Sequence, residues 1–326
     1  MKINNRLVSI EDLIGNKIDS KYTAIDQLLD DADINFNVDK ESLAETFGDK
    51  RYAGYFGVKR MDTNEVFAIV RKNYQPIQTI DILKPFHEIV TEFGAAYTNA
   101  GVISNGSKIW IQAQLPNSVE IRNNDVIKPY IMMLVSHDGK RTNAMFPYTS
   151  RIACNNQFYQ MTKSISTSDR ISHQRSWENQ LEICHRGFVT AIKSTADFAE
   201  QARELDSKSM SKSELEKFVG KIFKDSKVKI NNKEATVSAD TARETVISLF
   251  SVGEGNTGKT RWDAFNAVTE YLDHHKGSKR VNKAVNNPLR NIAKLNKTYE
   301  RKFMNGLQGG LDNNLKQQAF KLLLNS

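Results

Sequence analysis

The fold is decided by residues 128–158, which read KPYIMMLVSHDGKRTNAMFPYTSRIACNNQF. Tyr130 to Val135 is an unbroken apolar run of strand length. Asp138-Gly139 favours a two-residue type I′ turn, because both central residues of such a turn need positive φ. Arg141 to Ile152 then returns as the partner strand. We therefore predict a central β-hairpin around which the rest of the chain is arranged.

The return strand ends in a segment rich in polar side chains, which contains Arg151, Asn155 and Asn156. A guanidinium and two side-chain amides that leave a strand together can hold a phosphate and meet sugar or base edges. In the alternative interpretation, Arg151 pairs with an acid and Asn155 closes the turn. The segment is therefore predicted to be either a nucleic-acid-binding groove or a structural corner.

Two further hairpins and one helix are predicted before residue 160. Strand patterns and turn residues place the hairpins at 52–70 and 102–111, and helical spacing places the helix at 79–93. Pro85 should kink this helix or delay its start. An antiparallel sheet of hairpins is the expected core of this half of the chain.

After Phe158 the apolar spacing becomes helical, which predicts a long helix packed on the sheet and a helical, basic C-terminal region. The long helix is expected at 171–205, and shorter helices at 210–223, 243–250, 259–272 and 289–305. We expect a small hairpin about Asn231-Asn232 and a mobile tail beyond Gly309-Gly310. The fold class is therefore α+β, with an acidic N-terminal appendage at 1–50, a β-rich core at 51–165 and a mainly helical part at 166–326.

The positive charge is confined to the second half of the chain. Residues 1–150 carry 17 Lys and Arg against 19 Asp and Glu, residues 151–326 carry 29 against 19, and −2 and +10 sum to the net +8. A dense cluster of cations can bind nucleic acid by releasing counterions, although a solvated helix face is the alternative. The predicted contact residues in the densest cluster are Lys279, Arg280, Lys283, Arg290, Lys294, Lys297 and Arg301.

Gly253 to Thr260 reads GEGNTGKT and satisfies the P-loop pattern. A P-loop follows a buried strand, however, whereas residues 240–250 have the spacing of a helix. We therefore predict a helix–helix connection with Thr260 or Asp263 near the next N-terminus. Its amides, with Gly258, Lys259 and Thr260, remain a possible anion loop. A nucleotide-binding enzyme that uses Gly253–Thr260 is the competing hypothesis.

Other classes of site receive little support from the sequence. The N-terminus has no apolar signal region and no stretch is long enough to span a membrane, so we expect a cytoplasmic protein. Two cysteines, Cys154 and Cys184, do not make a zinc cluster. We expect no metal, no cofactor and no catalytic constellation.

Several blocks resemble a phage and plasmid family that carries a domain of unknown function numbered 932. The blocks are SHDG, RIACNNQF, NTGKTRWDAFNAVTEYLDHH and YQPIQTIDILKPF, and the resemblance covers roughly Tyr52 to Pro288. It implies a role in mobile-element DNA but supplies no catalytic residues. The expected architecture is also similar at the level of the fold to phage single-strand annealing proteins, which is an analogy only.

The predicted function is therefore binding of single-stranded DNA, with annealing in recombination or replication by a homo-oligomer. A nucleotide-dependent enzyme is one alternative, and an interaction protein that binds a host factor is another.

Overall fold

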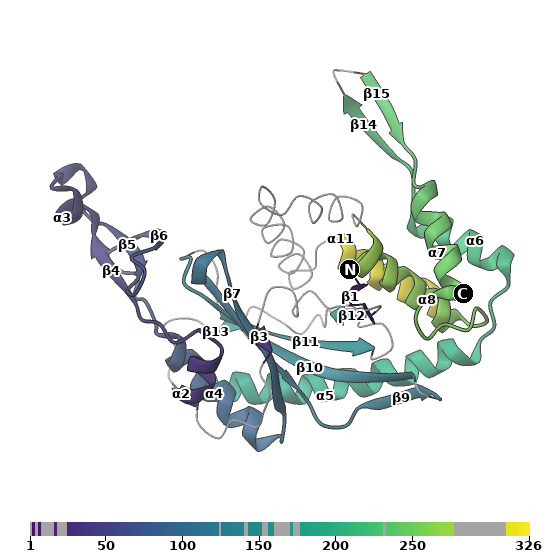
Figure 1. Ribbon diagram of the computed structural model, residues 1–326, viewed down its shortest axis with the longest axis horizontal. Coiled ribbons are helices and arrows are strands. Elements are labelled where there is room, and N and C mark those ends of the chain that lie inside the picture. The colour runs from purple at the N-terminus through teal and green to yellow at the C-terminus, as the bar shows by residue number, and fades with distance from the viewer. Residues whose placement is uncertain are drawn as a thin grey trace.

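The computed structural model describes residues 25–123, 125–139, 143–151, 177–230, 233–276 and 311–326, with five short strands at 2–3, 6–7, 16–17, 156–159 and 170–171. A central antiparallel sheet lies in the middle of the described part (Figure 1). The strand order is β12-β11-β10-β8-β7-β3, and β9 and β13 pair with β10 and β11. The strands are β3 (Asn16–Lys17), β7 (Ala96–Ile103), β8 (Lys108–Gln114), β9 (Val119–Arg122), β10 (Asp125–Ser136), β11 (Asn143–Arg151), β12 (Asn156–Tyr159) and β13 (Arg170–Ile171). The predicted α+β class is confirmed.

The central hairpin forms as β10 and β11, but the predicted turn length is wrong. Leu134 pairs with Ala144, whereas a two-residue turn at Asp138-Gly139 would pair Leu134 with Asn143. The Asp138 carboxylate turns inward instead: it accepts from the Ser136 hydroxyl at 2.8 Å and pairs with Lys108 at 2.9 Å. Side-chain bonds of this kind compete with the regular turn.

One face of the sheet packs on helices α4 (Thr79–Glu92) and α5 (Trp177–Ser207). Alternate residues of β8 and β10, such as Ile111 and Met133, lie in one buried cluster with Phe86 of α4 and Phe188 of α5. The long packing helix is therefore confirmed. Pro85 does not delay the start of α4, because the helix begins at Thr79 and carries the proline inside it.

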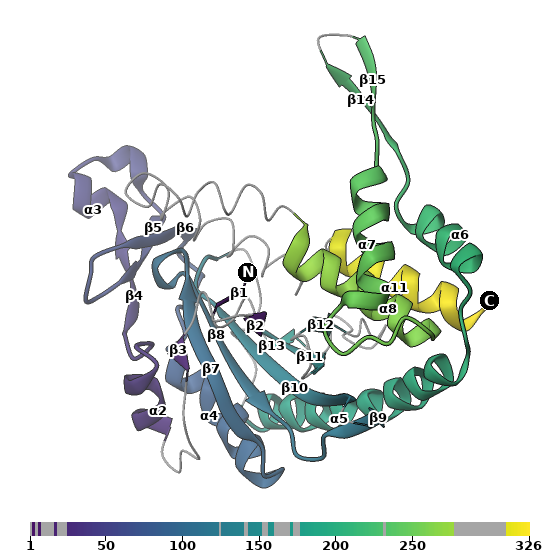
Figure 2. The same ribbon diagram turned by 45° about the vertical axis from the view of Figure 1, so that its right-hand side comes forward.

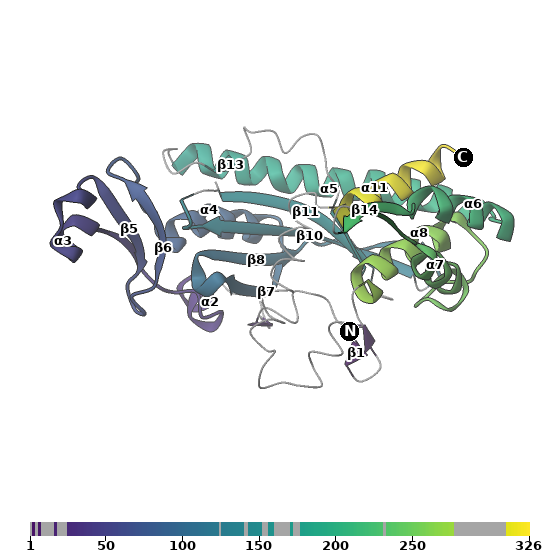
Figure 3. The same cartoon turned by 90° about the horizontal axis from the view of Figure 1, so that it is seen from above.

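A second core lies among the helices that follow. Phe198, Ala202 and Leu205 of α5 join a buried cluster with residues of four further helices. These helices are α6 (Lys212–Ile222), α7 (Asp240–Val252), α8 (Arg261–Glu270), extended by a π turn at Tyr271–His275, and α11 (Leu311–Leu324). Seen from above, α5 runs along the sheet into this helical cluster (Figure 3). Each large apolar side chain buried there stabilises the fold by about 1.5–3 kcal/mol.

The tail expected to be mobile contains α11, whose Ala319, Phe320 and Leu323 are buried in the second core. This prediction is therefore wrong for residues 311–324. Asn313 and Asn314, two weak helix formers, lie in the first turns of this helix, where tertiary packing overrides weak propensity.

The segment expected as an acidic appendage takes part in the first core. Leu28 and Leu29 of α2 (Ile25–Asp31), with Ile34 and Val38, belong to the same buried cluster as the sheet. Beyond them lies a small sheet in the order β4-β5-β6. Its elements are β4 (Val38–Ser42), α3 (Leu43–Phe47), the 3₁₀ turn Lys50–Tyr52, β5 (Tyr55–Arg60) and β6 (Val66–Arg71). The N-terminal residues 25–49 are thus integral to the β-rich part.

Two small hairpins complete the described fold. Strands β1 (Lys2–Ile3) and β2 (Arg6–Leu7) pair with each other. Strands β14 (Ser226–Ile230) and β15 (Lys233–Val237) form the hairpin predicted about Asn231-Asn232. The second hairpin projects away from the body in two views (Figures 1 and 2). No helix in the described part of the chain is long and apolar enough to cross a membrane.

Candidate functional site

The predicted site at the end of β11 is built around a buried ion pair. The guanidinium of Arg151 donates to both carboxylate oxygens of Asp125, at 2.6 and 2.7 Å, and neither side chain is more than 4% exposed. The same carboxylate accepts from Trp262 Nε1 at 2.8 Å. Because Asp125 begins β10 and Arg151 ends β11, this pair joins the ends of the two central strands. Bidentate pairs of this type fix orientation as well as distance.

Arg151 also reaches the loop between α7 and α8. Its Nη1 donates to the Glu254 carbonyl at 2.9 Å and to Asn256 Oδ1 at 3.1 Å, and Nη2 donates to the Gly255 carbonyl at 2.8 Å. The guanidinium is therefore surrounded by acceptors of the protein itself. This geometry corresponds to the alternative in which Arg151 pairs with an acid, and it presents no open guanidinium to a phosphate.

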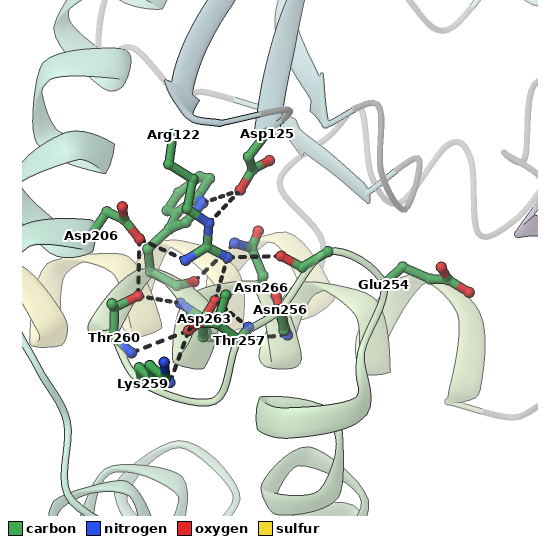
Figure 4. Close-up of polar contacts among 12 residues, drawn as sticks. Arg122, Asp125, Asp206, Glu254, Asn256, Thr257, Lys259, Thr260, Asp263 and Asn266 are labelled. Atoms are coloured by element: carbon green, nitrogen blue, oxygen red, sulfur yellow. Dashed lines mark hydrogen bonds and ion pairs between the residues drawn. The ribbon is translucent and has the colours of Figure 1, made fainter.

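A second arginine, Arg122 at the end of β9, makes a parallel connection. It donates to Asp206 of α5 at 2.7 Å, to Asp263 of α8 at 2.5 Å and to the Gly255 carbonyl at 2.8 Å. Figure 4 shows Arg122 between these two carboxylates, with the loop beside it. The two arginines thus tie the sheet, the end of α5 and the α7–α8 loop into one polar network.

The P-loop-like segment Gly253–Thr260 already holds an anion, the carboxylate of Asp263 (Figure 4). Asp263 Oδ2 accepts from the amides of Lys259 and Thr260, at 3.0 and 3.1 Å. Thr257 donates its hydroxyl to Oδ2 at 2.7 Å and its amide to Oδ1 at 3.2 Å. Of the residues predicted to form an anion loop, Lys259 and Thr260 therefore have their amides bonded to a side chain of the same protein.

The pKa of the fully buried Asp263 carboxyl lies below its ordinary value of 3.8. Burial by itself raises this pKa, but hydrogen bonds from Arg122, the Lys259 amide and Thr257 favour the charged form and outweigh it. The carboxylate is thus ionised at neutral pH and matches the positive donors around it.

The elements that flank the loop are those of a helix–helix connection, as predicted. Helix α7 precedes the loop, and Thr260 caps α8 in a capping box with Asp263. Gly258 has a φ of 71°, and a Cβ there would lie 2.8 Å from the Ser251 hydroxyl. Turn geometry and close packing account for this glycine without a bound phosphate.

Of the remaining predicted contact residues, the described structure places Asn156 next to this network. Asn156 begins β12 and pairs in register with Arg151. Asn155 and the seven cations from Lys279 to Arg301 lie outside the described residues.

Tyr130 and Gln114, in a polar and aromatic row on the face of the sheet turned away from α4 and α5, were not predicted from the sequence. The register aligns Gln114, Tyr130, Tyr148 and Tyr159 across β8, β10, β11 and β12. The Tyr130 and Tyr148 rings stack with centroids 5.2 Å apart. Tyr130 is half-buried and Tyr148 is buried. The apolar run around Tyr130 hid this row, because its alternation becomes visible only when the strand partners are known.

Comparison with known protein families gives a match over most of the chain. The family model described as Domain of unknown function (DUF932) matches residues 66–297. No curated protein and no solved structure matches the chain. The matched range contains Arg122, Asp125, Arg151 and Asp263, so the network lies within the part of the chain that the family shares.

Proposed function

We propose, from the premise that this chain belongs to the family described as Domain of unknown function (DUF932), that it binds single-stranded DNA for a phage or other mobile element. In this proposal the protein acts in the host cytoplasm as a homo-oligomer and promotes annealing of complementary strands. It works by binding, without a cofactor or a catalytic centre.

The observation that carries the proposal is the distribution of charge. Residues 151–326 hold 29 basic against 19 acidic residues. Arg151 and Arg122 are engaged by acids in the interior, so the network does not supply the DNA contacts. The contacts fall instead to other cations of the second half, which would bind phosphates by releasing counterions. The half-buried Tyr130 and Lys128, on the face of the sheet turned away from α4 and α5, offer stacking and charge together.

Fluorescence anisotropy with a labelled single strand over a range of salt concentrations tests the proposal. We expect log K to fall steeply with log salt, and charge reversal at Lys294, Lys297 and Arg301 to flatten the slope. A strand-annealing assay then separates annealing from binding alone. Absence of binding to single-stranded DNA at low salt would remove the proposal.

The host-factor alternative is favoured by one observation, an exposed apolar surface near the β4-β5-β6 sheet. Phe47 and Ile69 are 64% and 65% exposed, and Val66 is 55% exposed. Exposed apolar side chains of this size often mark protein contacts. If the protein fails to bind DNA, and Phe47→Ser with Ile69→Ser abolishes its association with a purified host protein, this alternative replaces the proposal.

A further inference from the structure

The β14–β15 hairpin is a projecting arm that the packing of the fold does not explain. Within the described part of the chain, its two strands make their extended contacts only with each other. Val237 at its base is 50% exposed. A two-stranded hairpin without a packed face is marginally stable in water, so a role outside the core is expected for it.

The arm and the helix before it carry an unbalanced positive charge. Residues 212–237 contain seven lysines and four acids, Glu214, Glu216, Asp225 and Glu234. Two of these acids are already engaged, because Glu214 accepts from the Ser211 amide at 2.8 Å and Asp225 accepts from Arg243 at 2.7 Å. Glu234 lies opposite Lys229 in the register of the hairpin. Lys221, Lys224 and Lys227 are exposed and make no ion pair with any described residue.

Lysines elsewhere in the helical part are placed differently. Lys208 pairs with Glu204, Lys316 pairs with Asp273, and Lys276 pairs with Asp312. These cations contribute to the charge balance of the folded protein. Lys221, Lys224 and Lys227 thus differ from these lysines in two respects: they lie on the projecting arm and its approach, and they have no acidic partner among the described residues.

The lysines of the arm also form a line. Helix α6 buries Leu215, Phe218, Val219 and Ile222. Lys217 and Lys221, one helical turn apart and therefore about 6 Å apart along the axis, are exposed. Lys224 and Lys227, both exposed, continue from the end of the helix into β14.

We propose that this lysine line, residues 217, 221, 224 and 227, binds the phosphate backbone of a single-stranded nucleic acid. The inference rests on the proposed function and adds a contact site to it. A row of exposed ammonium groups on successive elements suits a polyanion better than a compact anion, since each phosphate can meet a separate lysine. Lysine–phosphate contacts do not read the sugar, so DNA and RNA strands share the chemistry that the arm recognises.

The test uses the full chain with Lys221→Gln, Lys224→Gln and Lys227→Gln combined. A matched control carries Lys50→Gln, Lys72→Gln and Lys84→Gln, three exposed lysines of the β-rich part, so that both variants lose the same charge. Binding of labelled oligo-dT and oligo-rU is measured by anisotropy across a salt series. Urea unfolding shows that both variants keep the stability of the parent protein.

We expect the arm variant to bind about tenfold more weakly or worse and its salt slope to fall by about 2, since each phosphate contact to a single strand contributes about 0.7. The control should retain the parent slope. If the parent binds and the arm variant binds equally well, or if the control loses as much, the inference is overturned while the proposed function stands. If the parent protein binds neither oligonucleotide, the inference and the proposed function are both refuted. A change in oligomeric state with unchanged binding would assign the arm to a second copy of the chain and overturn the inference.

Discussion

Replacement of Asp263 by alanine tests the idea that the α7–α8 loop is closed by a carboxylate of the protein. Asp263 is fully buried. Its carboxylate accepts from the amides of Thr257, Lys259 and Thr260, from the Thr257 hydroxyl and from Arg122, at 2.5 to 3.2 Å. The alanine variant leaves all of these donors without their acceptor. Removing one partner of a buried charged network costs about 3–5 kcal/mol, which for a protein of this size lowers Tm by on the order of 10 °C.

Urea unfolding of the parent protein and the variant measures the loss directly. Glu204→Ala serves as the control, because it removes an acid that pairs with Lys208 on the surface and should change stability little. Formate supplies the missing carboxylate in a form small enough to enter the vacated space. We therefore expect formate, compared with chloride at equal ionic strength, to stabilise Asp263→Ala more than the parent protein.

Two results would refute this reasoning. A loss of less than about 1 kcal/mol would mean that water or a rearranged loop satisfies the donors as well as the carboxylate does. A full loss without any formate effect would mean that the variant fails by a general packing defect and not through its unpaired donors.

The remaining predictions concern the same network and the first core. Arg151→Met should cost about 3–5 kcal/mol in urea unfolding and leave DNA affinity per folded molecule unchanged, whereas a stable variant that loses DNA binding would make Arg151 a contact residue. Calorimetry with ATP and Mg²⁺ should show no saturable micromolar binding in the parent protein or in Lys259→Ala, and binding abolished by that substitution would favour the enzyme alternative. The pKa of Asp263 is lowered on folding, so the contribution of its charged form to stability is complete above the ordinary pKa of 3.8 and is lost as pH falls through the lower folded value. Asp263→Asn should therefore make the free energy of unfolding fall less steeply at acid pH. An unchanged dependence on pH would contradict this. Burial raises the pKa of the Cys184 thiol to about 12, so iodoacetamide at pH 8 should label the peptide that contains it only after unfolding, and rapid labelling of the native protein would show that the thiol is accessible.

Local sequence signals predicted the elements of the fold well. Strand-length apolar runs with turn residues predicted the β7–β8 and β10–β11 hairpins, and helical spacing predicted α4 and α5. Thr260 or Asp263 was predicted near the N-terminus of the helix after the loop, and both take part in the capping box that begins α8, a signal within four residues. These features depend on neighbours in the sequence, which a single sequence shows directly.

Features that depend on distant partners were predicted less well. The Asp263 carboxylate also accepts from Arg122, which lies 141 positions earlier in the chain. No local sequence pattern predicts such a contact. The sequence did offer a partial sign, since Asp263 stands three residues after the cap, where a carboxylate turns back toward free amides. Helix α11 was missed for a related reason, because the cluster of α5 and α8 side chains that buries Phe320 is built elsewhere in the chain.

The shared use of α5 has a consequence for how this protein can be divided. Phe188 lies in the first core and Phe198 in the second, less than three helical turns apart on one continuous helix. A cut before α5 strips the sheet of its covering helix, and a cut after it leaves the remaining helices without their central partner. Neither half is therefore a unit that recombination between genes could transplant intact, and an expression boundary drawn near residue 165 should yield two insoluble fragments.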